Sequence, residues 1–331
     1  MKKITVLITI DTEHSVGGAF RDSTLKPVGN AKRIYGRVNG GEYGIPMMMD
    51  IADRYGIPLT FFVEVLNHHY FGSAATSEVC RYILERGHDV QLHLHPTFIN
   101  FSEKRPGAKP YSDCMSAYSL EAQTALIQQG VAILNDYCGR PPVAFRAGNY
   151  AADINTLRAL KTNNLKIDSS YNLAFPNLSR MICPKELNDV TRIEGIWELP
   201  ITTFRQTLPG IPKFRPLDLN GVSFGEIRAL LENARKGKGP GFVTVILHSF
   251  SFLIPGDIQY RNCRINTVVR RRFTNLCRYL AEHPDSFSPL SLSGAHQALP
   301  PGPNTQPPGP PSFFSMPPHL TLARLFQQLF S

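Results

Sequence analysis

The sequence predicts an α/β fold of the barrel type. Short apolar runs rich in β-branched residues alternate with stretches of helical periodicity, which is the pattern of parallel strands joined by helices. Residues that bind metals or transfer protons stand at or beside the ends of five of these runs. Strand ends of a barrel gather at one rim, so residues far apart in sequence can form a single site there.

The length and composition fit one large domain followed by a tail. With 331 residues, 42% of them hydrophobic, the chain can bury a full core. From about Ser286 the composition shifts to Pro, Ser and Gly, and residues 299–318 hold too many prolines for a helix or an inner strand. We expect a catalytic barrel over residues 1–292, a Pro-rich linker over 293–318 and a short amphipathic helix over 319–331.

Seven runs are expected to be buried strands, because they are apolar and β-branched and almost all are short. They are Ile4–Ile10, Leu59–Val63, Val90–His93, Val143–Arg146, Leu165–Asp168, Ile196–Ile201 and Phe242–His248.

Helical periodicity between these runs predicts five helices. They cover Ile45–Tyr55, Ser77–Arg86, Ser119–Tyr137, Asp153–Thr162 and Phe224–Arg235. Ser119 and Asp153 are expected to be N-caps, and Gly56, Gly87 and Gly139 are expected to follow helix C-termini.

Two further segments have a distinctive composition. Pro200–Gly221 is rich in Pro and Phe with little periodicity, so we expect a loop that either walls a substrate groove or is a plain surface excursion. Near the C-terminus, an i, i+3, i+4, i+7, i+8 spacing predicts an apolar stripe that docks on its own chain, on a partner or on a membrane surface. The stripe consists of Leu322, Leu325, Phe326, Leu329 and Phe330.

The composition favours a cytoplasmic protein with reduced thiols. The run from Ile4 is too short for a signal peptide and leads directly into Asp11, and no stretch is long enough to span a membrane. The six cysteines show no C-x-x-C pair, so disulfides are not expected. Much of the formal charge of +9 lies between Arg261 and Arg278 without an interleaved aromatic platform, which favours a solvated helix face over nucleic-acid binding.

Two pairs of residues predict a metal site. Asp11 and Glu13 stand two apart at the end of the first run, so both carboxylates point to one side if the strand continues. His93 and His95 have the same spacing, and two imidazoles from one strand end can bind one zinc-like ion. The alternatives are a turn cap for a lone carboxylate and a chance pair among ten histidines.

Three more residues stand at run ends. The guanidinium of Arg146 can keep a nearby carboxylate ionised, or it can form a purely structural salt bridge. His248 and Asp168 are expected to meet across the rim, where the carboxylate would keep the imidazole protonated for donation to a leaving group. Either one alone is also compatible with a satisfied core residue.

The five segments together resemble the conserved blocks of the polysaccharide deacetylase superfamily, also called the NodB-homology or carbohydrate esterase family four proteins. In chain order they read I-T-I-D-T-E-H-S, H-D-V-Q-L-H-L-H-P, F-R-A-G-N-Y, I-D-S-S and V-T-V-I-L-H-S, and the resemblance spans Ile4–Leu292. It implies a distorted seven-stranded (β/α) barrel that removes an N- or O-acyl group with one divalent metal ion.

The resemblance also assigns a role to each of six residues. The implied roles are general base for Asp11, metal carboxylate for Glu13, orientation of the base for Arg146, an oxyanion-binding backbone N–H for Tyr150, tuning of the acid for Asp168 and catalytic acid for His248.

The sequence departs from the family pattern in three blocks. Many members have adjacent aspartates where this chain has Asp11 and Glu13. The two metal histidines are usually four apart, but Thr97 stands four residues after His93, so His95 must take the second place. In the third block Gly148-Asn149 replaces the more common proline. The run G-E-Y-G-I-P-M-M-M from Gly41 resembles a subgroup that acts on cytoplasmic or atypical substrates.

The expected function is removal of an acyl group, foremost an N-acetyl group, from an amino sugar of a polysaccharide or its precursor. The expected cofactor is zinc, with cobalt or nickel as alternatives, held by Glu13, His93 and His95. An amidohydrolase of the allantoinase type, acting on a small cyclic amide, and a catalytically silent carbohydrate-binding member remain as alternatives. A glycoside hydrolase is disfavoured, because Asp11 and Glu13 on one strand end cannot easily straddle a sugar.

Overall fold

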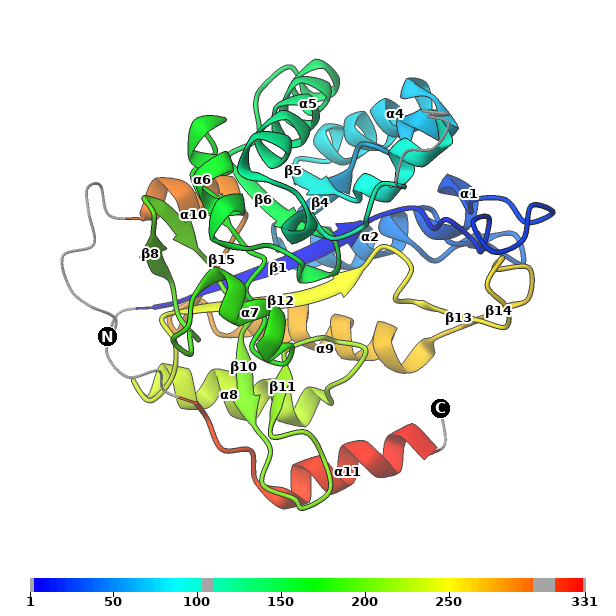
Figure 1. Cartoon of the computed structure of the whole chain (residues 1–331). Helices are drawn as coiled ribbons and strands as arrows, with labels where there is room; N and C mark the ends of the chain where they lie inside the picture. Colours follow the sequence, from blue (N-terminus) through cyan, green and yellow to red (C-terminus); the bar gives the residue numbers. More distant parts are fainter. Residues whose placement is uncertain (1–2, 103–109, 300–312, 330–331) are drawn as a thin grey trace.

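The fold is built on one curled nine-stranded sheet. The computed structural model describes residues 3–102, 110–299 and 313–329. Neighbouring strands follow the order β12-β1-β4-β5-β6-β7-β9-β8, and β15 pairs with the first half of β1 (Figure 1). The strands are β1 (Ile4–Thr12), β4 (Thr60–Glu64), β5 (Asp89–Leu94), β6 (Ala144–Ala147), β7 (Ile167–Asp168), β8 (Thr191–Ile193), β9 (Ile196–Glu198), β12 (Phe242–His248) and β15 (Phe287–Leu290).

The structure confirms the predicted α/β barrel and all seven expected strands. All pairs in this sheet are parallel except β8 with β9. Sequence patterns did not indicate β8 and β15, because β8 is polar and short and β15 contains Pro289. Proline is tolerated there because β15 lines only the start of β1, next to the edge of the sheet.

Helices connect the strands and cover the outside of the sheet. The helices are α1 (Asn30–Arg33), α2 (Ile45–Arg54), α3 (His68–Phe71), α4 (Ser73–Glu85), α5 (Leu120–Cys138), α6 (Ile154–Thr162), α7 (Pro176–Ile182), α8 (Phe224–Arg235), α9 (Thr267–Glu282), α10 (Leu292–Ala298) and α11 (Pro318–Leu329). Short 3₁₀ turns lie at Pro96–Phe101, Met115–Ala117 and Gly148–Tyr150. Three two-stranded ribbons pair β2 (Arg37–Val38) with β3 (Gly41–Glu42), β10 (Thr203–Arg205) with β11 (Phe214–Pro216) and β13 (Leu253–Pro255) with β14 (Cys263–Ile265).

The five helices expected from periodicity are confirmed, together with their end signals. The Ser119 hydroxyl accepts a hydrogen bond from the Ala122 backbone N–H, and Asp153 forms a capping box with Thr156. Gly139 ends α5 in the left-handed conformation, with φ of 67°. Local chemistry at the helix ends was therefore readable from the sequence.

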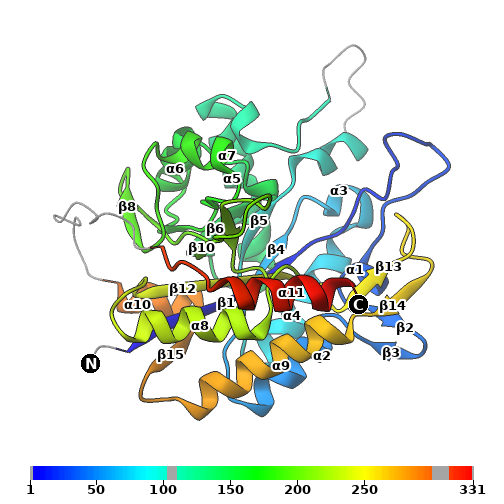
Figure 2. The ribbon, with the colours of Figure 1, turned by 90° about the horizontal axis from the view of Figure 1, so that it is seen from below.

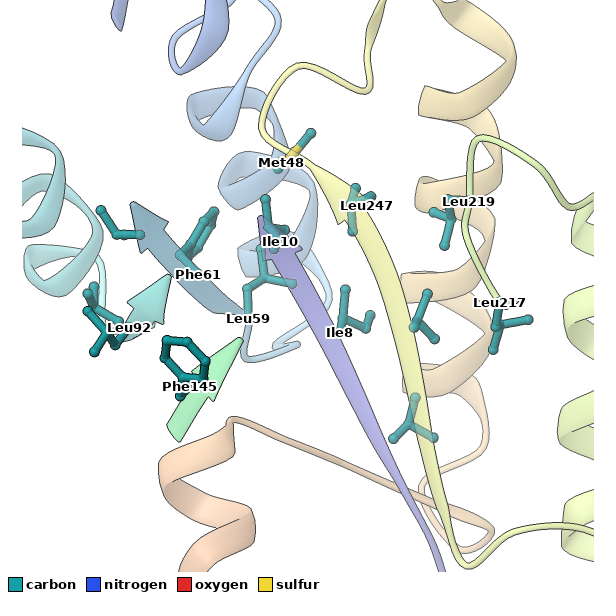
Figure 3. Packing of buried hydrophobic residues seen from close by; sticks show 14 of the residues in the cluster. Ile8, Ile10, Met48, Leu59, Phe61, Leu92, Phe145, Leu217, Leu219 and Leu247 are labelled. Atoms are coloured by element: carbon teal, nitrogen blue, oxygen red, sulfur yellow. The ribbon is translucent and has the colours of Figure 1, made fainter. Parts of the chain in front are cut away.

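The side chains of the sheet form two apolar layers. Alternate residues of β1, such as Ile8 and Ile10, join the large outer cluster under the helices, part of which is shown in Figure 3. Leu7 instead joins a smaller cluster with Phe62 and Trp197. Side chains from β1, β4 and β9 can meet only on the concave side, so this cluster fills the barrel interior, and α10 contributes to it as well.

The segment between β9 and α8 closes the barrel, which corrects the expectation of a loop over Pro200–Gly221. The Thr202 backbone N–H donates to the Thr244 carbonyl at 3.2 Å, and the Thr244 N–H donates to the Thr202 hydroxyl at 2.9 Å. The Leu219 N–H bonds to the Ile246 carbonyl at 3.1 Å. Both passages therefore lie beside β12, and the ribbon β10–β11 projects between them.

The tail docks on its own chain, with a different face from the one predicted. Helix α11 is confirmed and lies along α8 (Figure 2), but Leu322 and Phe326 of the predicted stripe are 56% and 64% exposed. Its buried residues are Thr321 and Arg324, and Arg324 Nε lies 3.0 Å from the buried carboxylate of Glu226. The docked face thus contains this polar contact and Leu320, which packs against the core and lies outside the predicted stripe.

Part of the expected domain division lies outside the residues that the structure describes. The residues 300–312 of the predicted linker, residue Phe330 and the side chain of Leu329 lie outside the described residues. The first part of the expected linker is helical, because α10 covers Leu292–Ala298. Among the described residues, no helix combines the length and the apolar character that crossing a membrane requires.

The ion pair under α11 makes a stability prediction. Arg324→Ala leaves the carboxylate of Glu226 buried without its cation, so we expect a loss of about 3 kcal/mol in the free energy of unfolding. Leu322→Ala, on the exposed face of the same helix, should change it by less than about 0.5 kcal/mol. Urea unfolding measures both, and equal losses in the two variants would contradict the observed docking face.

Candidate metal and acid–base site

Three potential metal ligands converge at the carboxyl ends of β1 and β5. Glu13 follows β1, His93 lies in β5 and His95 follows it. Glu13 Oε2 lies 2.7 Å from His95 Nε2 and 3.4 Å from His93 Nε2, and one ligand atom from each residue lies within 4.8 Å of the others. The structure thus brings together the three residues that the sequence predicted as a metal site.

Both imidazoles are held in the orientation that metal binding requires. His93 Nδ1 lies 2.8 Å from the carbonyl oxygen of Arg146, which can only accept a hydrogen bond. His95 Nδ1 lies 2.9 Å from a carboxylate oxygen of Asp113. When Nδ1 carries the proton, the lone pair stands on Nε2, and both Nε2 atoms face Glu13.

The two oxygens of the Glu13 carboxylate contact different partners. Arg33 Nη2 lies 2.8 Å from Oε1, while Oε2 faces the histidines. Burial alone would raise the pKa of Glu13, but the charge of His95, hydrogen bonds from both histidines and the charge of Arg33 hold it well below its ordinary value. The Arg33 guanidinium is itself fixed, 3.3 Å above the Phe250 ring centroid.

His95 and Asp113 form a charge-coupled pair. Burial would lower the pKa of His95, yet the nearby carboxylates of Asp113 and Glu13 raise it well above its ordinary value. The same pairing, against the opposing effect of burial, lowers the pKa of Asp113. Asp113 also accepts a hydrogen bond of 2.8 Å from the Asn149 side chain, which fixes the carboxylate from its other side.

The turn after β6 is shaped around His95. A Cβ atom at Gly148 would lie 2.6 Å from the His95 ring, so only glycine leaves room for the imidazole there. Asn149 and Tyr150 both adopt left-handed backbone angles, with φ of 55° and 57°. Consecutive non-glycine residues in this region store strain, which is typical of functional sites.

Asp11 lies in a buried ion pair deeper in the barrel. Arg146 Nη1 lies 2.6 Å from Asp11 Oδ1, and the two side chains are 0% and 5% exposed. The remaining guanidinium nitrogens bond to Thr9 and Ser169, and the group stacks over Phe62. Such a fully bonded arginine fixes the carboxylate in place.

His248 and Tyr150 lie near Asp11. His248 is the register partner of Asp11 on the neighbouring strand, so the two side chains lie on the same side of the sheet. Burial and the negative charge of Asp11 raise the pKa of the Tyr150 hydroxyl. Among the described backbone hydrogen bonds outside the interiors of helices and strands, none is donated by the Tyr150 N–H.

Asp168 does not meet His248. In register, Ala144 pairs with Ile167 and Phe145 with Asp168, so Asp168 shares the outer side with Phe145, while Ser169 faces Arg146 in the interior. The neighbour of Asp168 is Glu198 on β9. The sequence placed Asp168 at the correct strand end, but the alternation of the strand turns its side chain away from the rim.

Several residues of the site were not predicted. Arg33 lies in a four-residue helix and Asp113 in a loop, and neither position carries a periodic or motif signal. Glu64 is in register with His93 and accepts backbone N–H groups of Leu66 and Asn67, and burial raises its pKa to about 8. Glu64 directly follows the apolar run Leu59–Val63, and a position at the end of such a run is the same sequence signal that predicted Glu13.

The metal-ligand triad opens onto a cavity of about 460 Å³. Its lining includes Glu13, His95, Arg33, Asp113, Thr97 and Phe20. Phe20 and Ile258 line the cavity while remaining 50% and 54% exposed, so its mouth is partly apolar. Asp11, His248 and Tyr150 are not among its lining residues. Asp11 precedes Glu13 by two positions and lies a layer deeper in the barrel.

Comparison with known proteins agrees with this architecture. A candidate polysaccharide deacetylase from Mycobacterium smegmatis superposes over 93% of this chain and 96% of its own, with a TM-score of 0.50 and 18% identity. The chain has the polysaccharide deacetylase fold. The resemblance inferred from the five blocks is thereby confirmed at the level of the fold.

Two other solved structures match the chain with TM-scores below 0.5. A protein of Pseudomonas aeruginosa described as a polysaccharide deacetylase matches with a TM-score of 0.46 and 14% identity, covering 88% of each chain. A 4-alpha-glucanotransferase from Thermococcus litoralis matches with a TM-score of 0.49 and 10% identity, over 96% of this chain and 42% of its own. These two agreements are too loose to bear on function. No protein-family model and no curated protein sequence matches the chain.

The buried carboxyl pair outside the rim makes a pH prediction. Burial and the charge of Asp168 raise the pKa of Glu198 well above its ordinary value. The stability contributed by the protonated carboxyl is therefore fully present below the unfolded-state pKa of about 4.3 and is lost as the pH rises above it. Glu198→Gln stays neutral, so its free energy of unfolding relative to the natural protein should rise between pH 5 and pH 8.

Urea unfolding at the two pH values measures this difference. The exposed Glu186→Gln on the neighbouring loop is the control, and its difference from the natural protein should not change with pH. A Glu198→Gln difference that stays constant from pH 5 to pH 8 would show that Glu198 is ionised in the folded protein.

Proposed function

We propose that the chain is a metal-dependent hydrolase that removes an N-acetyl group from an amino sugar of a polysaccharide or its precursor. The observation that carries the proposal is the convergence of Glu13, His93 and His95, in which each histidine has its Nδ1 atom held by an acceptor. Chance clusters of histidine and carboxylate lack this second set of contacts, which is typical of metal ligands.

The donor set fits a divalent ion that accepts nitrogen and oxygen ligands. Zinc is the cofactor we propose, with cobalt and nickel as alternatives, and Glu13 Oε2 with the two Nε2 atoms would hold it. Three protein ligands leave room for water and substrate, as in catalytic zinc sites. A bound ion would acidify the attacking water and polarise the acyl carbonyl.

The chain's own residues supply the proton transfers. Asp11, held in place by its contact with Arg146, takes the proton of the attacking water. The Tyr150 backbone N–H donates to the oxyanion of the tetrahedral intermediate, and His248 protonates the departing amine. Asp168 has no direct part in this scheme, because it faces Glu198 on the other side of the sheet.

The cavity is compatible with a sugar substrate. Phe20 stacks on Phe101 with ring centroids 4.8 Å apart, and with Ile258 it gives an apolar surface for a sugar face or an acetyl methyl group. A small cyclic amide would use the same chemistry, so an allantoinase-type amidohydrolase remains the second candidate. We place the protein in the cytoplasm, where its six unpaired cysteines would stay reduced.

One observation favours a catalytically silent carbohydrate-binding protein. Arg33 already neutralises one oxygen of Glu13, and a guanidinium next to a ligand carboxylate weakens the attraction of a cation. Stoichiometric metal and chelator-sensitive activity would exclude this reading.

Loss of a ligand should remove both metal and turnover. The purified protein, reconstituted with zinc, is expected to release acetate from N-acetylated oligosaccharides or nucleotide sugars. His93→Ala should lower bound metal below stoichiometry and abolish release, and Asp11→Ala should abolish release while metal remains. A His93→Ala protein with full metal content and activity would refute the assignment, and no acetate from any of these substrates would favour the amidohydrolase.

The contact between His95 and Asp113 makes a prediction about metal affinity. Asp113→Ala removes the acceptor that orients His95, so zinc affinity should fall about 10–100-fold. Asp22→Ala removes an exposed carboxylate and should leave the affinity within about twofold of the natural protein. Competition with a chromogenic chelator measures both. Equal affinities for Asp113→Ala and Asp22→Ala would show that Asp113 does not support a ligand.

A further inference from the structure

Arg272 differs from the other buried arginines of the described residues. Four arginine side chains are buried among the described residues, and three of them contact a carboxylate within 3.0 Å: Arg33 with Glu13, Arg146 with Asp11 and Arg324 with Glu226. The fourth, Arg272 of α9, bonds only to the backbone carbonyls of Leu219 and Asn220. A buried guanidinium without an anion is costly, so this exception needs an explanation.

Arg272 lines a cavity of about 610 Å³ between α8, α9 and α11. Figure 2 shows these three helices side by side. The polar lining residues are Arg271, Arg272, Asn275 and Gln327, and the apolar ones include Phe224, Val268 and Phe326. None of them lines the cavity at the metal-ligand triad. The cavity therefore combines two neighbouring guanidiniums with an apolar wall.

Arg272 is buried with part of its guanidinium unpaired. Arg272 is 5% exposed, and its Nε has no hydrogen-bond partner in the described chain. The same holds for Nη1 of Arg324. Burial, and the charge of Arg324 as well, lowers the pKa of Arg272 although Glu226 and Asp218 oppose this. Burial is the largest of these effects, and no described carboxylate lies in hydrogen-bond contact with Arg272.

We propose that this cavity binds a small phosphate-bearing ligand with an apolar part. Two adjacent guanidiniums match the charge and the several acceptor oxygens of a phosphate better than those of a single carboxylate. Asn275 and Gln327 add amide donors at the same wall, and Phe224, Val268 and Phe326 contact the apolar part. Because Phe326 and Gln327 belong to α11, the ligand also ties this helix to α9.

Calorimetric titration with inorganic phosphate and with phenyl phosphate, at ionic strength held constant with chloride, tests the proposal. Phenyl phosphate should bind at least about fivefold more tightly than inorganic phosphate, because its ring reaches the apolar wall. Arg272→Met and Arg271→Gln should each weaken phenyl phosphate binding by about tenfold or more. Arg228→Gln removes an exposed charge from α8 outside the cavity and should change it by less than about twofold.

A thermal measurement separates loss of binding from loss of folding. Arg272→Met removes a buried charge and also its hydrogen bonds to the carbonyls of Leu219 and Asn220, so the melting temperature of this variant without ligand is the reference for its response to ligand. Phenyl phosphate should raise the melting temperature of the natural protein but not of Arg272→Met. Arg271→Gln, at an exposed position, keeps the test valid if Arg272→Met does not fold.

A further comparison distinguishes a soluble ligand from a lipid headgroup. Vesicles of phosphatidylcholine with phosphatidic acid present the same phosphate on a membrane, and their co-sedimentation with the natural protein but not with Arg272→Met assigns the site to a lipid phosphate. Binding of phenyl phosphate alone, lost in Arg272→Met, assigns it to a soluble ligand. The proposal is overturned if neither probe binds, or if Arg228→Gln weakens binding as much as Arg272→Met.

Discussion

The buried guanidinium of Arg146 is the constraint on which both halves of the candidate site depend. Its side chain fixes Asp11 on β1 and bonds to Ser169 beyond β7, so three strands are joined inside the barrel. Its carbonyl oxygen accepts the hydrogen bond of His93 Nδ1 and so sets which imidazole nitrogen faces Glu13. One residue therefore positions the proposed base and one proposed metal ligand together, and movement of β6 would disturb both.

Two of the three departures from the pattern that the resemblance implies are explained by one local arrangement. The sequence places its second histidine two residues after His93 instead of four, and it has Gly148-Asn149 where proline is more common. In the structure these changes touch each other: the His95 ring lies against the position where Gly148 has no Cβ, and Asn149 bonds to the Asp113 carboxylate that holds His95. A proline at 148 would collide with the imidazole, so the third block accommodates the altered second block.

Strong local patterns made most of the fold and part of the site predictable. Seven strands and five helices followed from periodicity, and Glu13, His93 and His95 followed from their place at strand ends. The expected meeting of Asp168 with His248 was wrong because the sequence indicates where this strand ends but not which of its faces lines the barrel interior. The prediction of which face of α11 is buried was wrong because the burial of Arg324 depends on Glu226, a partner 98 positions away. Arg33 and Asp113 belong to segments whose position is set by tertiary contacts alone.

The charges around the triad decide whether an ion can bind there. Glu13 and Asp113 contribute two negative charges and Arg33 removes one, so with both histidines deprotonated, as metal ligation requires, the groups in direct contact carry a net charge of −1. A divalent cation bound between Glu13 Oε2 and the two Nε2 atoms would meet this charge, whereas the same cluster without Asp113 would be neutral. The carboxylate behind His95 therefore offsets the guanidinium on Glu13, in addition to orienting the ring. This balance favours a metal-loaded hydrolase over a silent binding protein, because a purely structural cluster has no need of a second carboxylate at the far nitrogen of its histidine.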